Sequence, residues 1–122
     1  MTSPNLTLFY VDSAKASTAF YRDLFGASPV ESSETFAMFV FPGGFKLGLW
    51  GNAGVEPAPA ASGGGGEVAF NLESPEAVDA LHAVWRDKGV AIAQAPTAMD
   101  FGYTFVGLDP DGHRLRGIYP TG

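Results

Sequence analysis

The chain contains no cysteine among its 122 residues. This absence excludes disulfides, thiolate metal ligands and cysteine nucleophiles together, and it fits a cytoplasmic protein. No apolar run approaches the roughly 18 residues that a membrane span needs, so we expect no contact with a membrane. Only seven residues are basic against thirteen acidic, which gives a formal net charge of -6. Phosphate backbones are repelled by such a chain, so nucleic acid is not expected as a partner.

Aromatic side chains, in contrast, are plentiful. They make up 13% of the chain and ten of them are Phe, whereas charged residues supply only 16%. A chain of this length forms one domain, expected to cover 1–122. Because its small core cannot hide all of these rings, we expect some to line a ligand pocket or a subunit interface.

The order of the predicted elements repeats after about 60 residues. A strand, a helix and three further strands are predicted over about 4–50, and the same order returns over about 67–120. The segment 51–66 between them is a linker by composition, because it is rich in Gly, Pro and Ala and ends in four glycines. The sequence therefore predicts an α+β fold of two βαβββ modules.

A hairpin closes the second module. Alternating β-prone residues at 103–108 and 114–119 flank the sequence DPDG at 109–112. Proline presets φ at the second position of this turn, and glycine tolerates a left-handed conformation at the fourth. Along the second arm, Arg116 must lie on the face opposite to Leu115. Arg116 is thus predicted to point either into water or into a cavity.

Three motifs, taken in this order, resemble the vicinal oxygen chelate superfamily of glyoxalases, bleomycin-resistance proteins and extradiol dioxygenases. They are FYVD at 9–12, FYRDLFG at 20–26 and DPDGH at 109–113. The stretches ESSETFAMFVF and MDFGYTFVGLDPDGHRLR are similar to phenazine-resistance proteins of the bleomycin-resistance branch. The resemblance implies a curved mixed sheet around a pocket. It also implies a homodimer, because relatives in this branch build each pocket from two subunits.

Metal-dependent members of that superfamily hold a metal with one ligand from each of four strands, and the matching positions here are Asn5, Gly48, Glu67 and Arg116. Only Glu67 is an outright ligand, since glycine has no side chain and a guanidinium brings a permanent positive charge. We therefore expect no metal, no cofactor and no catalytic residue. Glu67 and Arg116 are predicted either to form an ion pair that replaces the metal or to lie as two solvated charges at the rim.

A pocket without its metal indicates a binding protein rather than an enzyme. The expected ligand is a planar aromatic small molecule, an antibiotic, that is sequestered by stacking on Trp50 and nearby rings. If Asn5 and Gly48 face the pocket, as the resemblance implies, strand alternation turns Phe9 and Trp50 to the pocket and Leu8 and Leu49 to the helices. The missing side chain of Gly48 then admits a flat group beside Trp50; alternatively, Gly48 is a twist point and Trp50 packs on the linker.

The full predicted ligand-binding set combines these strand positions with rings and loop residues of the second module. It consists of Trp50, Phe9, Gly48, Tyr103, Phe105, Phe101, Met99, Glu67, Arg116 and Asn5.

Two other functions stay open at this point. One is a metal-dependent glyoxalase- or dioxygenase-like enzyme with a non-standard metal site. The other is a protein with a vestigial pocket, filled by its own side chains, that associates through its sheet edges. The two histidines do not favour an enzyme, because His82 is expected at the boundary of a helix stripe and His113 is expected to be exposed.

Overall fold

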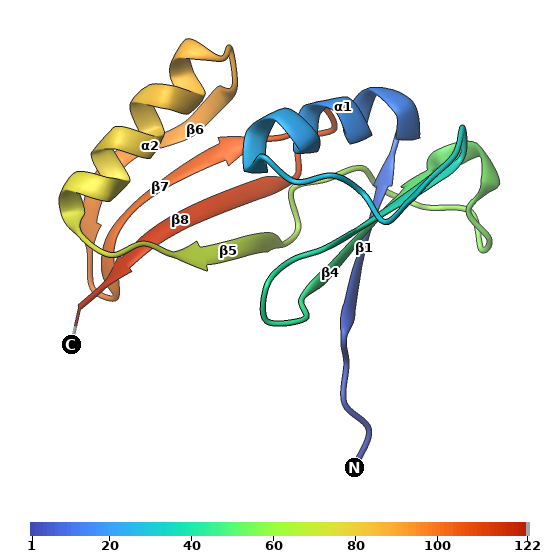
Figure 1. The fold of residues 1–122 in the computed structure, drawn as a ribbon, viewed down its shortest axis with the longest axis horizontal. Helices are drawn as coiled ribbons and strands as arrows, with labels where there is room; N and C mark the ends of the chain where they lie inside the picture. The colour runs from blue at the N-terminus through green and yellow to red at the C-terminus, as the bar shows by residue number, and fades with distance from the viewer. Residues whose placement is uncertain (122) are drawn as a thin grey trace. The chain divides into compact units, whose positions relative to one another are not determined.

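The computed structural model describes residues 1–121. The chain divides into two compact units, Met1–Gly63 (unit 1) and Gly64–Gly122 (unit 2), and the division falls within the segment that composition assigns to a linker. Each unit holds a four-stranded sheet and one helix of the α class (Figure 1). The predicted α+β fold of two βαβββ modules is confirmed.

Unit 1 has the strand order β1-β4-β3-β2, in which β1 and β4 are parallel and the other pairs are antiparallel. Its helix begins after Ser13, whose hydroxyl accepts a hydrogen bond from the Ala16 N–H, and ends at Gly26, where φ is 64°. The elements are β1 (Leu6–Val11), α1 (Ala14–Phe25), β2 (Glu31–Ser32), β3 (Phe36–Val40), β4 (Lys46–Gly51) and the 3-10 helix η1 (Asn52–Gly54).

The core of unit 1 lies between α1 and one face of its sheet. Leu47 and Leu49 of β4 are fully buried there, together with Tyr21 of α1. Phe9 lies opposite Leu49 in the parallel pairing and is buried on the same face. The predicted orientation of β1 is therefore wrong, and Leu8 faces away from α1. Both sets of alternating residues in β1 are mostly apolar, with Thr7 as the one polar side chain without an aromatic ring, so the pattern alone did not tell its two faces apart.

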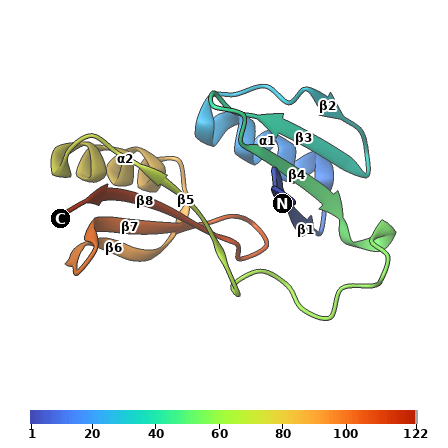
Figure 2. The same cartoon turned by 90° about the horizontal axis from the view of Figure 1, so that it is seen from below.

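Unit 2 repeats this arrangement with the strand order β5-β8-β7-β6, and α2 lies along one face of the sheet in both views (Figure 1; Figure 2). Its helix begins after Ser74, whose hydroxyl accepts from the Ala77 N–H, with proline at the first helical position. The elements are β5 (Glu67–Asn71), α2 (Pro75–Asp87), β6 (Ala91–Met99), β7 (Gly102–Leu108) and β8 (Arg114–Pro120).

Trp85 of α2 is the centre of the second core. Its ring lies 5.1 Å from that of Phe105 and 5.8 Å from that of Phe70, centroid to centroid. A Cβ atom at Gly107 would lie 2.7 Å from Cε3 of Trp85, so the indole occupies the space that a side chain on β7 would need. Glycine at this strand position therefore allows the helix to pack closely on the sheet.

The predicted hairpin is confirmed as β7 and β8, which pair in an antiparallel ladder. The N–H of Gly112 donates to the carbonyl of Asp109 at 3.1 Å, and Gly112 has a φ of 85°. The preceding strand, β6, continues to Met99, so Met99 lies at a strand end rather than in a loop. The register of β6 against β7 shifts between Ile92 and Gln94 and again between Gln94 and Thr97. The second shift contains Pro96, which cannot donate to the ladder.

Neither α1 nor α2 is long and apolar enough to cross a membrane, and no other helix among residues 1–121 is.

Candidate functional site

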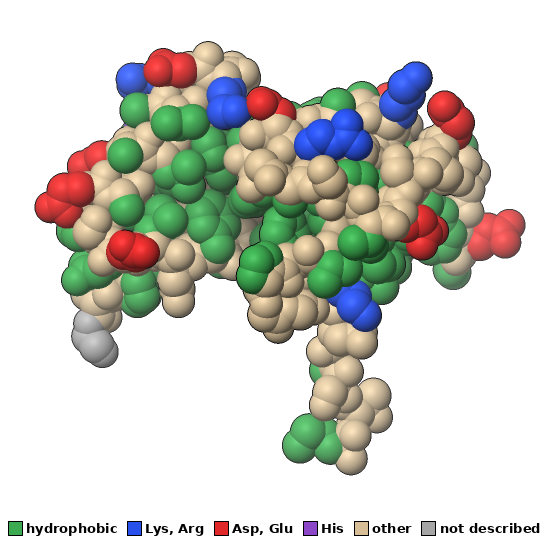
Figure 3. Space-filling model, viewed as in Figure 1, with side chains coloured by type: hydrophobic (Ala, Val, Ile, Leu, Met, Phe, Trp, Pro, Cys, Tyr) green, Lys and Arg blue, Asp and Glu red, His purple; other side chains and the backbone are tan. Residues whose placement is uncertain are grey.

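The sheet of unit 1 has a second face, opposite to α1, and η1 lies beside it at Trp50, where a Cβ atom at Gly54 would be 3.7 Å from Nε1 of the indole. Because Leu47 and Leu49 point into the core, the alternate residues of β4 and their partners point to this side. Hydrophobic side chains reach the surface over β1 and β4 (Figure 3). We call this the open face of unit 1; its residues are Leu6, Leu8, Tyr10, Phe36, Met38, Val40, Lys46, Gly48 and Trp50.

Two rings form an aromatic pair at the end of this face. Tyr10 lies opposite Trp50 in the register, and the ring centroids are 6.3 Å apart with an interplanar angle of 79°, an edge-to-face arrangement. Tyr10 is 37% exposed and Trp50 is half-buried. Aromatic rings prefer offset or edge-to-face contacts, so a partly exposed pair of this kind offers a planar molecule a ready partner.

The space above Gly48 is filled by the protein itself. A Cβ atom at this position would lie 2.6 Å from Cδ2 of Leu8 and 3.2 Å from Cζ of Phe36. The prediction that the missing side chain admits a flat ligand group is therefore wrong. Gly48 instead lets Leu8 and Phe36 close over β4, while Leu8 remains 40% exposed and free to rotate outward.

The sheet of unit 2 also has a face opposite to its helix, and Arg116 is the centre of it. The Nε atom of Arg116 donates to both carboxylate oxygens of Glu67 at 3.0 Å, and Nη2 lies 2.9 Å from Oε2. Nη1 donates to Oε1 of Gln94 at 3.0 Å and to Oγ1 of Thr104 at 3.3 Å. The side chain of Arg116 is 14% exposed and that of Glu67 is 31% exposed. The predicted ion pair is present, and the guanidinium uses its fork of donors within the protein.

Phe101 and Met99 complete this cluster. The Cζ atom of Arg116 lies 5.8 Å from the centroid of the Phe101 ring, a cation–π distance. The amide nitrogen of Gln94 lies 3.5 Å from the sulfur of Met99. Four predicted residues of unit 2 are thus brought together, while Gln94 and Thr104 were missed. Thr104 could have been found, since alternation along β7 and the hairpin register place it on the face of Arg116.

This donor set does not fit a divalent metal. The oxygens of Glu67 are already engaged by a guanidinium, Gly48 has no donor, and Asn5 is exposed ahead of β1. Among residues 1–121 there is no group of three or more His, Asp or Glu side chains placed to hold a metal ion. A cation brought next to Arg116 would meet a fixed positive charge at close range in a partly desolvated site. A metal-dependent mechanism cannot be built on these residues.

The structure places three predicted ligand residues away from the open faces. Phe9 lies in the core of unit 1, and Phe105 is fully buried beside Trp85 in the core of unit 2. The hydroxyl of Tyr103 donates to Oδ1 of Asp79 on α2 at 2.7 Å, and this hydrogen bond, with desolvation and the charge of Asp79, raises the pKa of Tyr103 above its ordinary value. The expected orientation of Phe9 is therefore wrong, and Tyr103 and Phe105, two rings of the predicted ligand-binding set, do not lie on the face of Arg116. Strand alternation places Tyr103 and Phe105 on the face of the sheet that carries Leu115, opposite to the face of Arg116.

His113 is buried, in contrast to its predicted exposure. Its Nδ1 atom lies 2.9 Å from Oδ2 of Asp109, while Oδ1 of Asp109 accepts hydrogen bonds from the N–H groups of Asp111 at 2.9 Å and of His113 at 2.8 Å. The carboxylate thus organises the whole turn between β7 and β8. His82 lies where it was expected, half-buried at the edge of the core with its ring 5.7 Å from that of Phe105.

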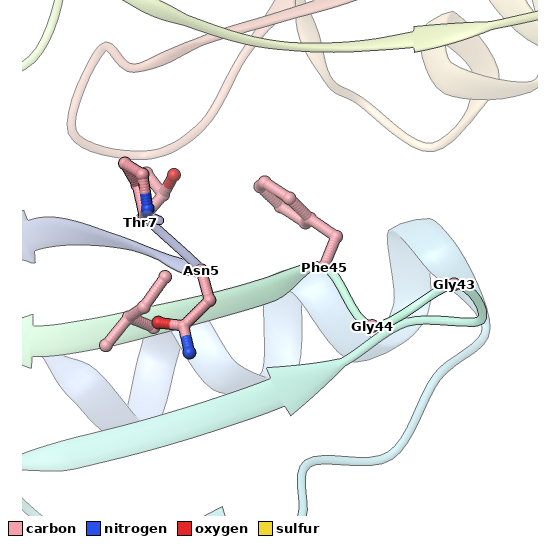
Figure 4. A pocket seen from close by; sticks show the side chains of 7 residues that line it. Asn5, Thr7, Gly43, Gly44 and Phe45 are labelled. Carbon is pink, nitrogen blue, oxygen red and sulfur yellow. The ribbon is translucent and has the colours of Figure 1, made fainter. Parts of the chain in front are cut away.

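A pocket of about 460 Å³ lies at one end of the unit 1 sheet (Figure 4). Asn5 from the segment ahead of β1 and Phe45 from the turn before β4 contribute to its wall. Asn5 is the only predicted ligand residue among those that line it, which are Pro4, Asn5, Leu6, Thr7, Gly43, Gly44 and Phe45.

The paired βαβββ units are the architecture expected of the superfamily that the sequence motifs resemble. A family model described as Glyoxalase/Bleomycin resistance protein/Dioxygenase superfamily matches residues 3–116, and the chain belongs to this superfamily.

Particular relatives narrow the comparison. The phenazine antibiotic resistance protein EhpR of Enterobacter agglomerans is 33% identical over 120 residues, which cover 93% of this chain and 89% of that protein. The solution structure of protein ATC0852 from Agrobacterium tumefaciens is 52% identical, with a TM-score of 0.93 and full coverage of both chains. A glyoxalase-related enzyme from Fulvimarina pelagi, 21% identical, matches in fold, with a TM-score of 0.86 over 100% of this chain and 94% of that one.

Proposed function

We propose that this protein binds a planar aromatic small molecule without a metal and sequesters it, as a cytoplasmic resistance protein against an aromatic antibiotic. The observation that carries the proposal is the partly exposed pair of Trp50 and Tyr10 on the open face of unit 1. The resistance role of EhpR, a relative over nearly the whole chain, supports it.

The chemistry of the face of unit 2 that carries Arg116 favours binding over turnover. Arg116 and Glu67 are bound to each other, so neither is a free acid or base for proton transfer. What this face offers a ligand is the edge of Phe101 and the flexible thioether of Met99, which are 45% and 43% exposed. Both side chains suit a flat apolar molecule of undefined ring chemistry.

Calorimetric titration with phenazine, an uncharged planar tricycle, tests the proposal. We expect binding by the wild-type chain and a loss of at least about tenfold in affinity in Trp50→Ala, because a stacked ring contributes on the order of 1.4 kcal/mol. Val84→Ala, which truncates an exposed side chain on α2, is the control and should bind as the wild type does. Failure of phenazine and other aromatic compounds to bind, or an unchanged affinity in Trp50→Ala, contradicts the proposal.

Recovery of the ligand distinguishes sequestration from catalysis. After prolonged incubation with substoichiometric protein, mass spectrometry should return the ligand unchanged. A new product formed over many turnovers would identify an enzyme instead.

The proposal includes a homodimer, since bleomycin-resistance proteins build each pocket from two subunits. The exposed apolar side chains of the open face of unit 1, Leu6, Leu8 and Tyr10 among them, are the kind of surface that a second copy would cover. Sedimentation at micromolar concentrations should return about twice the mass of one chain; a monomer with and without phenazine would remove this part of the proposal.

A further inference from the structure

Positive charge is scarce on the sheets of this protein. Among its seven basic residues, those in or beside the helices are Lys15, Arg22, Arg86 and Lys88. Two of the others, Arg114 and Arg116, belong to β8 of unit 2. This leaves Lys46 as the one basic residue in the strands of unit 1, all of which lie within the described part of the chain.

Lys46 lies on the same face as the aromatic pair. It begins β4, opposite Leu6 on β1 and Val40 on β3, and strand alternation gives it the same orientation as Gly48 and Trp50. It is half-buried, and its side chain forms no hydrogen bond or ion pair with any residue of 1–121. An ammonium group with apolar neighbours and no counter-charge is an attractive partner for an anion.

Arg116 cannot take this role. Its Nε and Nη2 atoms are held by Glu67, and Nη1 is held by Gln94 and Thr104. A ligand carboxylate would have to displace the carboxylate of Glu67 from the guanidinium. Glu67 makes the same contact as part of the chain, whereas a free ligand loses translational freedom when it binds. On the unit 1 side, the acidic residue Glu31 faces the same way from β2, but it is exposed, lies opposite Met38 and is not paired with Lys46.

We infer that the ligand of the open face of unit 1 is an aromatic carboxylate, with its ring at Trp50 and Tyr10 and its carboxylate at Lys46. This inference rests on the proposed function and names the ligand class of that site. The Cα atoms of Lys46 and Trp50 are four residues apart, about 13 Å along an extended strand, and a lysine side chain that leans along the strand shortens the gap. The pocket adjoins this end, since Leu6 lines it and Phe45 directly precedes Lys46.

Titration with a matched pair of probes, phenazine and phenazine-1-carboxylate, tests the inference. The wild-type chain should bind the carboxylate more tightly than phenazine. Lys46→Met should weaken carboxylate binding by about tenfold, because it removes a charge-assisted contact that partial exposure to water makes weaker than a buried one. Its affinity for phenazine should be unchanged. Lys46→Arg should retain most of the preference. Raising the salt concentration should reduce the preference in the wild type and have little effect in Lys46→Met.

Two controls remove the same charge elsewhere: Lys15→Met on α1 and Arg114→Met on β8. Both should keep the wild-type preference, and a loss in Arg114→Met alone would overturn the inference by moving the anion site to unit 2. Equal affinities of Lys46→Met and wild type for the carboxylate would also overturn it, while the proposed function would stand on phenazine binding and its loss in Trp50→Ala. If neither probe binds, both the proposed function and the inference fail.

Discussion

The ion pair between Glu67 and Arg116 can be tested by an asymmetry in its two truncations. In Glu67→Ala, the guanidinium keeps Gln94 and Thr104 as hydrogen-bond partners and the Phe101 ring as a cation–π contact, but it has no counter-charge, and its side chain is 14% exposed. In Arg116→Met, the carboxylate that remains is 31% exposed and can be hydrated. Leaving the more buried charge unpaired costs more, so Glu67→Ala should be the less stable variant.

The magnitude follows from the burial of the pair. An exposed ion pair contributes about 0.2–1 kcal/mol, and removing one partner of a fully buried pair costs about 3–5 kcal/mol. Because the exposure of this pair lies between those two limits, Glu67→Ala should lower the free energy of unfolding by about 2 kcal/mol and Arg116→Met by about 1 kcal/mol. In a chain of this size, about 2 kcal/mol lowers the melting temperature by roughly 8 °C. The double variant should be more stable than Glu67→Ala, because it removes the unpaired cation.

Urea denaturation followed by tryptophan fluorescence measures these differences. Because the two compact units could unfold separately, the series is made in a Trp50→Phe background, where the emission of Trp85 reports on unit 2 alone. Arg114→Met is the control: this exposed residue on the same strand forms no ion pair within 1–121 and should change stability by less than about 0.5 kcal/mol. A double variant no more stable than Glu67→Ala, or Glu67→Ala as stable as the wild type, would refute the argument.

Three further predictions concern packing, the hairpin turn and pH. Gly107→Ala should lower the free energy of unfolding of unit 2 by about 1–3 kcal/mol in the same urea assay, because its Cβ meets the fully buried Trp85. Gly48→Ala, measured by urea denaturation in a chain that retains Trp50 as the reporter of unit 1, should cost less than about 1 kcal/mol, because the exposed Leu8 can rotate away; equal costs of the two variants would contradict this. Asp109→Ala should lower the free energy of unfolding by about 2–4 kcal/mol, since two backbone N–H groups lose their acceptor. Asp109→Asn should cost less, because its amide oxygen still accepts; an alanine variant that costs less than the asparagine variant would exclude the role of Asp109 in the turn. Because the pKa of Tyr103 is raised in the folded state, its contribution to stability is complete below the ordinary value of 10.0 and is lost as the pH rises through the higher folded-state value. Ultraviolet titration should show one tyrosine that ionises at a higher pH than the others, and Asp79→Asn should lower its pKa.

Much of the fold is local information and was predictable. Ser13 and Gly26 bound the first helix because a hydroxyl satisfies a free N–H at its start and glycine adopts φ of 64° at its end. The turn at 109–112 follows from proline and glycine at its second and fourth positions, and the two arms that it joins pair as expected. The pairing of Glu67 with Arg116 was one of two predicted arrangements, and the structure selects it.

The error in the orientation of β1 has an identifiable cause. Alternation states which residues of a strand share a face, but only the packed helix decides which face becomes core. Polar residues resolve this for β8, where Arg116 cannot be core and Leu115 is. In β1 both faces are apolar, so Phe9 was assigned to the ligand and Leu8 to the helix, the reverse of what the structure shows.

The amino-acid sequence by itself determined the two βαβββ units, their caps and hairpin, and the guanidinium of Arg116 at a position where the resemblance implies a metal ligand, because each depends on residue chemistry or on neighbours close along the chain. Only the tertiary structure decided that Leu8 and Phe36 fill the space above Gly48, that Gln94 and Thr104 complete the shell of Arg116, and that Lys46 stays unpaired within 1–121. These contacts join strands far apart in the sequence, and their geometry exists only once helix and sheet have packed.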